Sequence, residues 1–235
     1  MANILAIVQD ATDRLGLVRP TAVVGSSDHQ VRQLLALANQ EGREQARRYG
    51  WEAITFEKTF TTVAAETQTS AVPSDFDRFV TGTFYNRTKS RTVFGPMTAQ
   101  EWQDYKGRLA TVVFDAFRMR GGDILIAPTP ASGETMAYEY ISKFWAGEAD
   151  DTAPTLSTIA SDTDIVFLDD EAFTQGIVWR FQRSRGLDYG ESFAQYEMHL
   201  AQLMGRDGGA RTLHMGAIGG NKPYPPVPPD GSWNL

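Results

Sequence analysis

The sequence predicts an α+β protein in which a helical bundle, built from an N-terminal and a C-terminal helix pair, carries an inserted, mostly antiparallel β unit. Apolar residues recur at helical spacing in the first 50 residues and again after residue 165, and the segment between them alternates with period two. Five prolines within residues 223–229 add an extended C-terminal arm, because proline fixes φ and lacks a backbone donor. The expected boundaries are 1–50 with 165–212 for the helical bundle domain, 51–147 for the inserted β domain, 148–164 for an acidic loop and 213–235 for the arm.

Two apolar stripes define the N-terminal pair. In the first helix, Gly16 follows the stripe and suits the left-handed conformation that ends many helices. The second helix starts after Ser26, Ser27 and Asp28, each of which offers an oxygen that can cap it, and ends at Gly50. The first stripe consists of Ile4, Ile7, Val8, Ala11 and Leu15, and the second of Val31, Leu34, Leu35, Ala38, Gly42, Ala46 and Tyr49.

The middle of the chain alternates like β-strands. Gly121 and Gly122 can adopt positive φ, so they predict a hairpin turn. Thr98 and Glu101 form a capping box that predicts a short helix within this region. The expected strands are 54–61, 79–86, 92–94, 112–119, 123–127 and 134–144.

The C-terminal pair begins at Asp169, an N-cap candidate, and its first helix ends at Gly186. Asp188 is expected to cap the second helix, whose stripe is Phe193, Tyr196, Leu200, Leu203 and Met204. Between Gly176 and Phe181 the first helix is apolar on nearly every side, interrupted only by Arg180, which is more apolar surface than one core face uses. We therefore expect a subunit interface at Ile177, Val178, Trp179 and Phe181.

The proline-rich arm carries apolar groups that favour docking onto a partner over a purely solvated tail. An exposed tail without a role is the simpler alternative. The candidate docking residues are Pro223, Tyr224, Pro225, Pro226, Val227, Pro228, Pro229 and Trp233.

Composition limits the possible functions. The formal net charge is −7, with 22 basic against 29 acidic residues, which argues against tight DNA binding but suits a surface past which DNA slides. The absence of cysteine excludes disulfides, thiolate metal sites and cysteine nucleophiles. We expect no membrane association, because no run of eighteen apolar residues and no basic leader occur.

No motif predicts catalysis. The three histidines are not paired at ligand spacing, and no nucleophile elbow, phosphate loop or zinc motif occurs. Asp162, Asp164, Asp169 and Asp170 could bind a divalent cation, but neither a glycine nor a bidentate glutamate completes a calcium loop. A solvated loop that leads into a helix cap is the favoured interpretation, so we predict no catalytic residue, metal or cofactor.

The ordered set of segments in this chain resembles the head–tail adaptor (connector) proteins of tailed bacteriophages over most of residues 1–212. The segments that carry this resemblance are 7–10 (IVQD), 14–17 (RLGL), 19–20 (RP), 33–39 (QLLALAN), Trp51, 177–189 (IVWRFQRSRGLDY), 196–197 (YE) and 206–209 (RDGG).

The resemblance implies a structural protein of the virion neck, synthesised in the host cytoplasm. Such proteins form a closed homo-oligomeric ring, usually a dodecamer, below the portal protein. They extend the DNA channel, which DNA passes without specific binding, and provide the attachment surface for a tail or neck protein. A C-terminal extension commonly reaches a neighbouring protein, and the arm here fits that feature.

Two other functions stay open at the level of sequence. A hydrolase acting on polysaccharide or peptidoglycan would need a carboxylate pair, for which Asp169 and Asp170 are the candidates. A monomeric binding module would present the proline-rich arm to an aromatic-lined groove.

Overall fold

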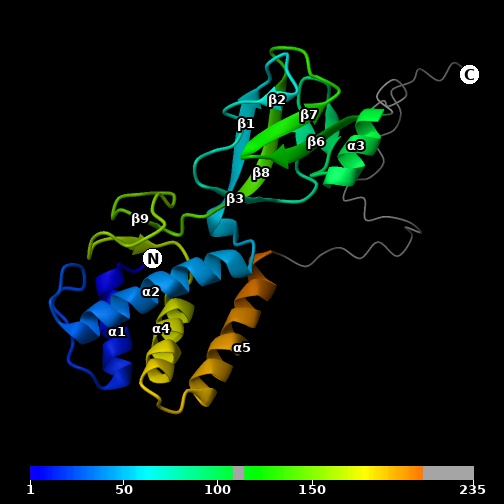
Figure 1. The fold of residues 1–235 in the computed structure, drawn as a ribbon. Helices are drawn as coiled ribbons and strands as arrows, with labels where there is room; N and C mark the ends of the chain where they lie inside the picture. Colours follow the sequence, from blue (N-terminus) through cyan, green and yellow to red (C-terminus); the bar gives the residue numbers. More distant parts are fainter. Residues whose placement is uncertain (108–113, 209–235) are drawn as a thin grey trace, which may run out of the picture.

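The chain folds into a helical unit and a β unit, joined end to end (Figure 1). The structure is a computed structural model that describes residues 1–107 and 114–208. Its helical unit contains α1 (Ile4–Leu15), α2 (His29–Arg48), α4 (Asp170–Ser184) and α5 (Gly190–Asp207). The β unit lies between α2 and α4 in the sequence, so the predicted α+β class is confirmed.

The helix ends are mostly those that the local sequence encodes. Asp28 accepts a hydrogen bond from the Gln30 amide at the start of α2, and Asp169 accepts one from the Ala172 amide at the start of α4. Gly16 ends α1 at φ 65°. The prediction for α5 was wrong, because its N-cap is Tyr189 and no side chain caps it. Asp188 accepts a hydrogen bond from the Gly190 amide instead.

α4 is the central helix of the helical unit, and α1, α2 and α5 all pack against it. Two tryptophans from outside the helices complete the same core: Trp51 follows α2, and Trp145 precedes the two-residue strand β9 (Ala146–Gly147). Trp145 is fully buried, and its indole Nε1 donates to the Ser157 carbonyl at 3.1 Å. The segment around residues 145–159, which the sequence assigns to the β unit and the acidic loop, therefore packs with the helices.

The β unit is a curled sheet in the order β1-β8-β4-β5-β6-β7-β2, with β3 also paired to β8. β1 (Thr55–Thr61) and β8 (Thr135–Ser142) form its longest ladder, from the pair Thr55–Ile141 to the pair Thr61–Thr135. All pairings are antiparallel except that of β5 with β6. The remaining elements are η1 (Glu52–Ile54), β2 (Thr67–Gln68), β3 (Phe76–Phe79), β4 (Tyr85–Asn86), β5 (Arg91–Phe94), α3 (Ala99–Gly107), β6 (Asp115–Arg120) and β7 (Asp123–Ala127).

Several strand predictions need correction. The single strand expected at 79–86 contains only the last residue of β3 and the two residues of β4, separated by a turn in which Gly82 has φ 83°. The predicted strand 112–119 begins outside the described residues, and β6 runs on to Arg120. β2, β9 and β10 (Ile165–Val166) were not expected from the sequence. The hairpin at Gly121 and Gly122 is confirmed, with φ of 65° and 90°.

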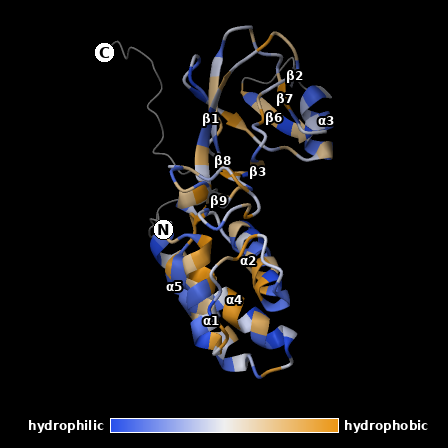
Figure 2. Ribbon diagram, turned by 90° about the vertical axis from the view of Figure 1, so that its left-hand side faces the viewer, coloured by the Kyte–Doolittle hydropathy of each residue, from blue (hydrophilic) through white to orange (hydrophobic). Residues whose placement is uncertain are grey.

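The β unit has an aromatic core of its own. Phe84, Phe117 and Tyr138 are buried there, and the Phe84 and Phe117 ring centroids lie 4.5 Å apart. A smaller cluster under α3 contains Trp102 and Tyr105. Figure 2 shows the two units stacked along the long axis of the molecule.

Candidate assembly surfaces

The residues expected at a subunit interface lie mostly inside the protein. Ile177 is fully buried, and Trp179 and Phe181 are only 6% and 3% exposed, while Val178 is half-buried. These side chains belong to the core that α4 forms with its three neighbouring helices. The apolar composition of α4 is therefore accounted for within the chain, and the surplus of apolar surface that motivated the interface is not present on this helix.

Exposed apolar surface lies instead along the turn before α5 and on α5 itself. Met198 is 61% exposed and Leu187 is 56% exposed, and the rings of Tyr189 and Phe193 are each 38% exposed. Phe193 stands edge-on to Trp179, with centroids 5.0 Å apart, so the exposed face is continuous with the core. Figure 1 shows α5 at the outer side of the helical unit.

The sequence contained part of this signal. Phe193 belongs to the predicted stripe of α5, but in that stripe only Tyr196 and Leu200 are fully buried. Met198 lies off the stripe, and an isolated exposed methionine is ordinary in soluble proteins. Phe193 and Met198 are five residues apart on α5, so they lie about 140° apart around the helix and expose apolar surface on two sides of it.

A buried polar network holds α2, α4 and α5 in a fixed relation. Glu41 of α2 is fully buried, and its Oε2 lies 2.6 Å from Arg180 Nε of α4. Its Oε1 accepts hydrogen bonds from Tyr196 Oη of α5 at 2.5 Å and from Gln45 Nε2 at 2.6 Å. Arg180 also pairs with Glu44 at 2.7 Å. One carboxylate thus joins three helices through directional contacts.

The electrostatics of this network keep its members in one protonation state. Burial and the nearby Glu41 carboxylate both raise the pKa of Tyr196, so its hydroxyl stays protonated and donates. Burial opposes the charge of Arg180, but Glu41 and Glu44 outweigh that effect and raise the pKa of the guanidinium. Tyr196 is therefore a hydrogen-bond donor and Arg180 is charged at neutral pH.

Gly176 makes room for this network. A Cβ at this position of α4 would lie 2.2 Å from Cδ of Glu41 and 2.4 Å from its Oε1. The carboxylate passes through the space that a side chain would occupy. Glycine is a poor helix former, so its presence here reflects the close approach of Glu41.

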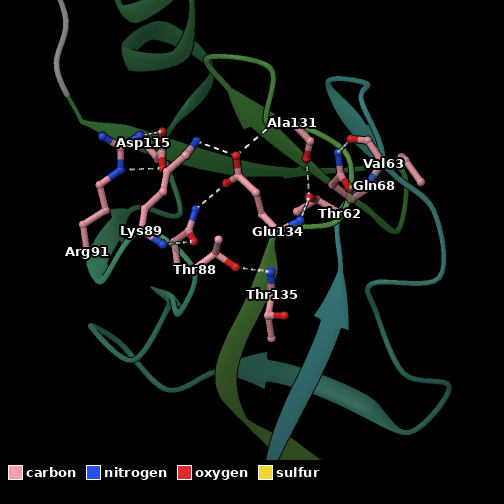
Figure 3. A network of polar contacts seen from close by, with 11 residues as sticks. Thr62, Val63, Gln68, Thr88, Lys89, Arg91, Asp115, Ala131, Glu134 and Thr135 are labelled. Carbon is pink, nitrogen blue, oxygen red and sulfur yellow. Dashed lines mark hydrogen bonds and ion pairs between the residues drawn. The ribbon is translucent and has the colours of Figure 1, made fainter.

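A second polar network lies in the β unit (Figure 3). Glu134, only 4% exposed, accepts hydrogen bonds from Asn86 Nδ2 at 2.7 Å and from the Ala131 amide at 3.1 Å, and Lys89 Nζ lies 2.6 Å from it. The Glu134 amide donates to Thr62 Oγ1. Burial raises the pKa of Glu134, but Lys89 and Asn86 outweigh this, so the pKa is lowered overall. The Glu134 carboxylate joins the β4–β5 turn to the loop before β8, and the Glu134 amide adds the segment after β1.

Next to this network, an ion pair and two exposed aromatic rings lie at the neighbouring central strands β5 and β6. Arg91 and Asp115 form a bidentate pair, with N–O distances of 2.9 and 2.7 Å. Phe94 and Phe114 are 51% and 42% exposed, and their ring centroids lie 4.9 Å apart. This exposed pair was not expected from the sequence.

The acidic residues weighed as a metal site are used within the fold. Each accepts a hydrogen bond from a backbone amide: Asp162 from Val23 and Val24, Asp164 from Ala160 and Ser161, Asp169 from Ala172, and Asp170 from Ala2. Within residues 1–107 and 114–208, no group of three or more histidine and acidic side chains is placed to hold a metal. Asp169 and Asp170, the carboxylates of the hydrolase alternative, thus have structural roles at the start of α4.

Three expectations from the sequence remain, on the C-terminal arm, the membrane and the domain boundaries. The docking residues of the arm, from Pro223 to Trp233, lie outside the described residues. Among the helices that the structure describes, none combines the length and hydropathy needed to cross a bilayer. The domain boundaries stay predictions.

Comparison with known proteins gives one finding. Residues 2–217 match the family model described as SU10 adaptor protein. No curated protein matches the sequence. The family match covers both helical pairs and the β unit, so it concerns nearly the whole chain.

Proposed function

The chain belongs to the SU10 adaptor protein family, and from this premise we propose that it is the head–tail adaptor of a tailed phage and assembles into a closed ring below the portal protein. Membership of this family makes the chain a structural adaptor of the virion neck that contacts other capsid or tail proteins. The ring, its dodecameric size, the portal as partner and DNA passing through the lumen are our proposal.

The family match over residues 2–217 is the observation that carries this function. Two features of the fold support it. The helical unit exposes an apolar face on α5, as a protein that works in an assembly requires. The carboxylates that an enzymatic function would use are engaged in backbone contacts.

We place the contact between subunits on the exposed apolar surface of α5 and the turn before it, which includes Leu187, Tyr189, Phe193 and Met198, in place of the buried residues of α4. A closed ring uses head-to-tail contacts, so this face meets a different surface of the next copy. We propose that residues 1–50 and 165–212 build the ring, with residues 51–147 as a separate domain that projects from it.

Met198→Glu tests this placement. Met198 is 61% exposed, so the substitution leaves the monomer core intact while it puts a charge into the proposed contact. Gln103→Glu is the control, because Gln103 is an exposed residue of α3 in the β unit, away from α5. By sedimentation velocity and electron microscopy with the portal protein present, we expect rings for the wild type and for Gln103→Glu, and smaller species for Met198→Glu. A wild-type chain that stays monomeric with portal overturns the ring; intact Met198→Glu rings overturn only the placement on α5.

The arm is proposed to bind a neighbouring protein of the neck. Its support is compositional: Tyr224, Val227 and Trp233 sit on a proline-stiffened segment that cannot bury them in a helix or a central strand. Deleting residues 221–235 is expected to leave the melting temperature unchanged and to weaken co-sedimentation with portal or tail protein. Unchanged co-sedimentation would leave the arm without this role.

A further inference from the structure

A concave site at the junction of the two units is lined by basic side chains. The pocket has a volume of about 230 Å³ and opens beside the C-terminal half of α2, at the end of β8 and next to the loop that follows β9. Its lining residues are Arg43, Ala46, Arg47, Asp77, Ser142, Lys143, Ser157 and Thr158. They come from segments about 100 residues apart, so the site exists only in the folded chain.

The three cations of this site lack an ionic partner in the described part of the chain. Arg43 and Arg47 are exposed and stand one turn apart on the same face of α2, and Lys143 approaches them from the end of β8. Some exposed arginines are paired, as Arg14 is with Glu171 at 2.6 Å, and others, such as Arg32, are not paired within the described residues. What distinguishes Arg43, Arg47 and Lys143 is that all three line one pocket. No ion pair joins Arg43, Arg47 or Lys143 to a residue within 1–107 or 114–208.

This arrangement is unfavourable unless something negative binds there. Like charges at i and i+4 on a helix destabilise it by roughly 0.2–0.5 kcal/mol. The carboxylate in the lining, Asp77, is engaged by Arg78 at 2.7 Å. A positive pocket therefore persists in a chain whose net charge is −7.

The other lining groups indicate which anion fits. Ser157 and Thr158 add hydroxyl-bearing residues to the lining that contains the two arginines. Guanidinium, ammonium and hydroxyl donors around one concavity are the usual partners of phosphate oxygens. We propose that this pocket binds phosphate groups of the DNA backbone. The choice of DNA over other sources of phosphate rests on the proposed adaptor function. The contact is weak and independent of sequence, since it uses few cations and no group that reads a base edge.

The proposal predicts how strongly the DNA-binding constant depends on salt concentration. Three phosphate contacts predict a slope of log K against log salt of about −2.7, because each neutralised phosphate contributes about −0.9. Removing both arginines should reduce the slope by about 1.8. At 50 mM salt, each lost contact should weaken binding by roughly tenfold on the same counterion-release relation.

The test uses the full chain and a fluorescently labelled 20-base-pair duplex, with anisotropy measured between 25 and 200 mM salt. The variants are Arg43→Gln with Arg47→Gln, and Lys143→Gln. Arg32→Gln is the matched control, since Arg32 is an exposed arginine on α2 three turns from the pocket. We expect the pocket variants to lose affinity and slope as stated, and the control to change neither. Equal DNA binding by all variants overturns the proposal.

Two further measurements distinguish DNA from the other anions that could occupy this pocket. In a titration, inorganic phosphate should bind far more weakly than the duplex at equal phosphate concentration. Equal binding would assign the site to free phosphate and overturn the DNA contact. Sedimentation velocity of the same variants should show unchanged assembly. Variants that fall apart while still binding DNA would assign the pocket to carboxylates of a neighbouring copy, which also overturns it. DNA binding by a wild-type chain that forms no ring would refute the ring alone.

Discussion

Replacing Gly176 with alanine should destabilise the protein, although alanine is the better helix former. In an open helix position the exchange favours folding by about 1 kcal/mol. Here the new methyl group would lie 2.2 Å from Cδ of Glu41, a contact that no rotamer of alanine avoids. The outcome depends on whether the Glu41 side chain can move.

The structure indicates that it cannot move without loss. Glu41 holds Arg180, Tyr196 and Gln45 at 2.5 to 2.6 Å, and it is fully buried. Overpacking a core costs about 1–3 kcal/mol, and breaking a buried charge pair costs about 3–5 kcal/mol. Arg180 keeps Glu44 as a partner, so only part of the cost of breaking a buried charge pair applies. After subtraction of the helix-propensity gain, we expect a net destabilisation of about 2–4 kcal/mol.

Urea unfolding of the full chain, followed by helical circular dichroism and tryptophan fluorescence, measures this change. Gly205→Ala in α5 is the control, because a Cβ there meets nothing within 4 Å; it should stabilise by about 0.4–1 kcal/mol. In a Glu41→Ala background, Gly176→Ala should cost at least about 1 kcal/mol less, since the clashing group is gone. A Gly176→Ala protein as stable as the wild type, beside a control that behaves as stated, would refute the close-approach argument.

Three other changes test the same reasoning elsewhere. Gly42→Ala in α2 should lower stability by about 1–3 kcal/mol in urea unfolding, because a Cβ would lie 2.4 Å from the buried ring of Trp145; unchanged stability would contradict it. Glu134→Ala should speed amide hydrogen exchange in the loops of the β unit while the helices stay protected, since it leaves buried donors unsatisfied. Exchange that rises equally in both units would show that the network is not local. Arginine partners lower the pKa of Glu171 and Glu197, so their stabilisation is present above the unfolded pKa near 4.3 and is lost as pH falls below it. Melting temperatures measured from pH 7 to 3 should fall below about pH 4.5, and a flat profile would contradict the assignment.

Local signals predicted much of the helical unit. The caps at Asp28 and Asp169, the left-handed Gly16 and the capping box of Thr98 with Glu101 depend on residues within one turn of each other. Such contacts form in any chain with the same short segment, and so sequence reasoning finds them. The hairpin at residues 121–122 belongs to the same class.

The sheet was predicted less well because its pairing is not local. Two-residue strands such as β2 and β9 contain no periodicity to detect, and they exist because a partner strand lies beside them. The parallel pairing of β5 with β6 needs the crossover through α3. The division of the segment 79–86 follows from the turn at Gly82, which the alternation of its neighbours conceals.

The assembly surface shows the same limit. The apolar sequence of α4 is compatible with a helix at the centre of the core and with a helix at a subunit interface. The sequence alone does not distinguish these two positions. The choice is made by Phe173, Ile177 and Phe181, which the other helices and Trp145 enclose. The basic pocket needs even more of the tertiary fold, since Arg43 and Lys143 are 100 residues apart in the chain.

The buried network and the exposed face of α5 are connected by a requirement of ring closure. In a head-to-tail ring every subunit repeats the same rotation, so a small error in the direction of one helix is multiplied around the circle. Apolar packing is not directional and tolerates sliding, whereas hydrogen bonds restrict angle as well as distance. Tyr196 lies on α5 between Phe193 and Met198, and its hydroxyl is held by Glu41 of α2. If α5 carries the contact between subunits, this bond sets the angle at which the contact is presented. A charged group in the core then serves the geometry of the assembly more than the stability of the monomer, which agrees with the small or negative net stabilisation typical of buried ion pairs.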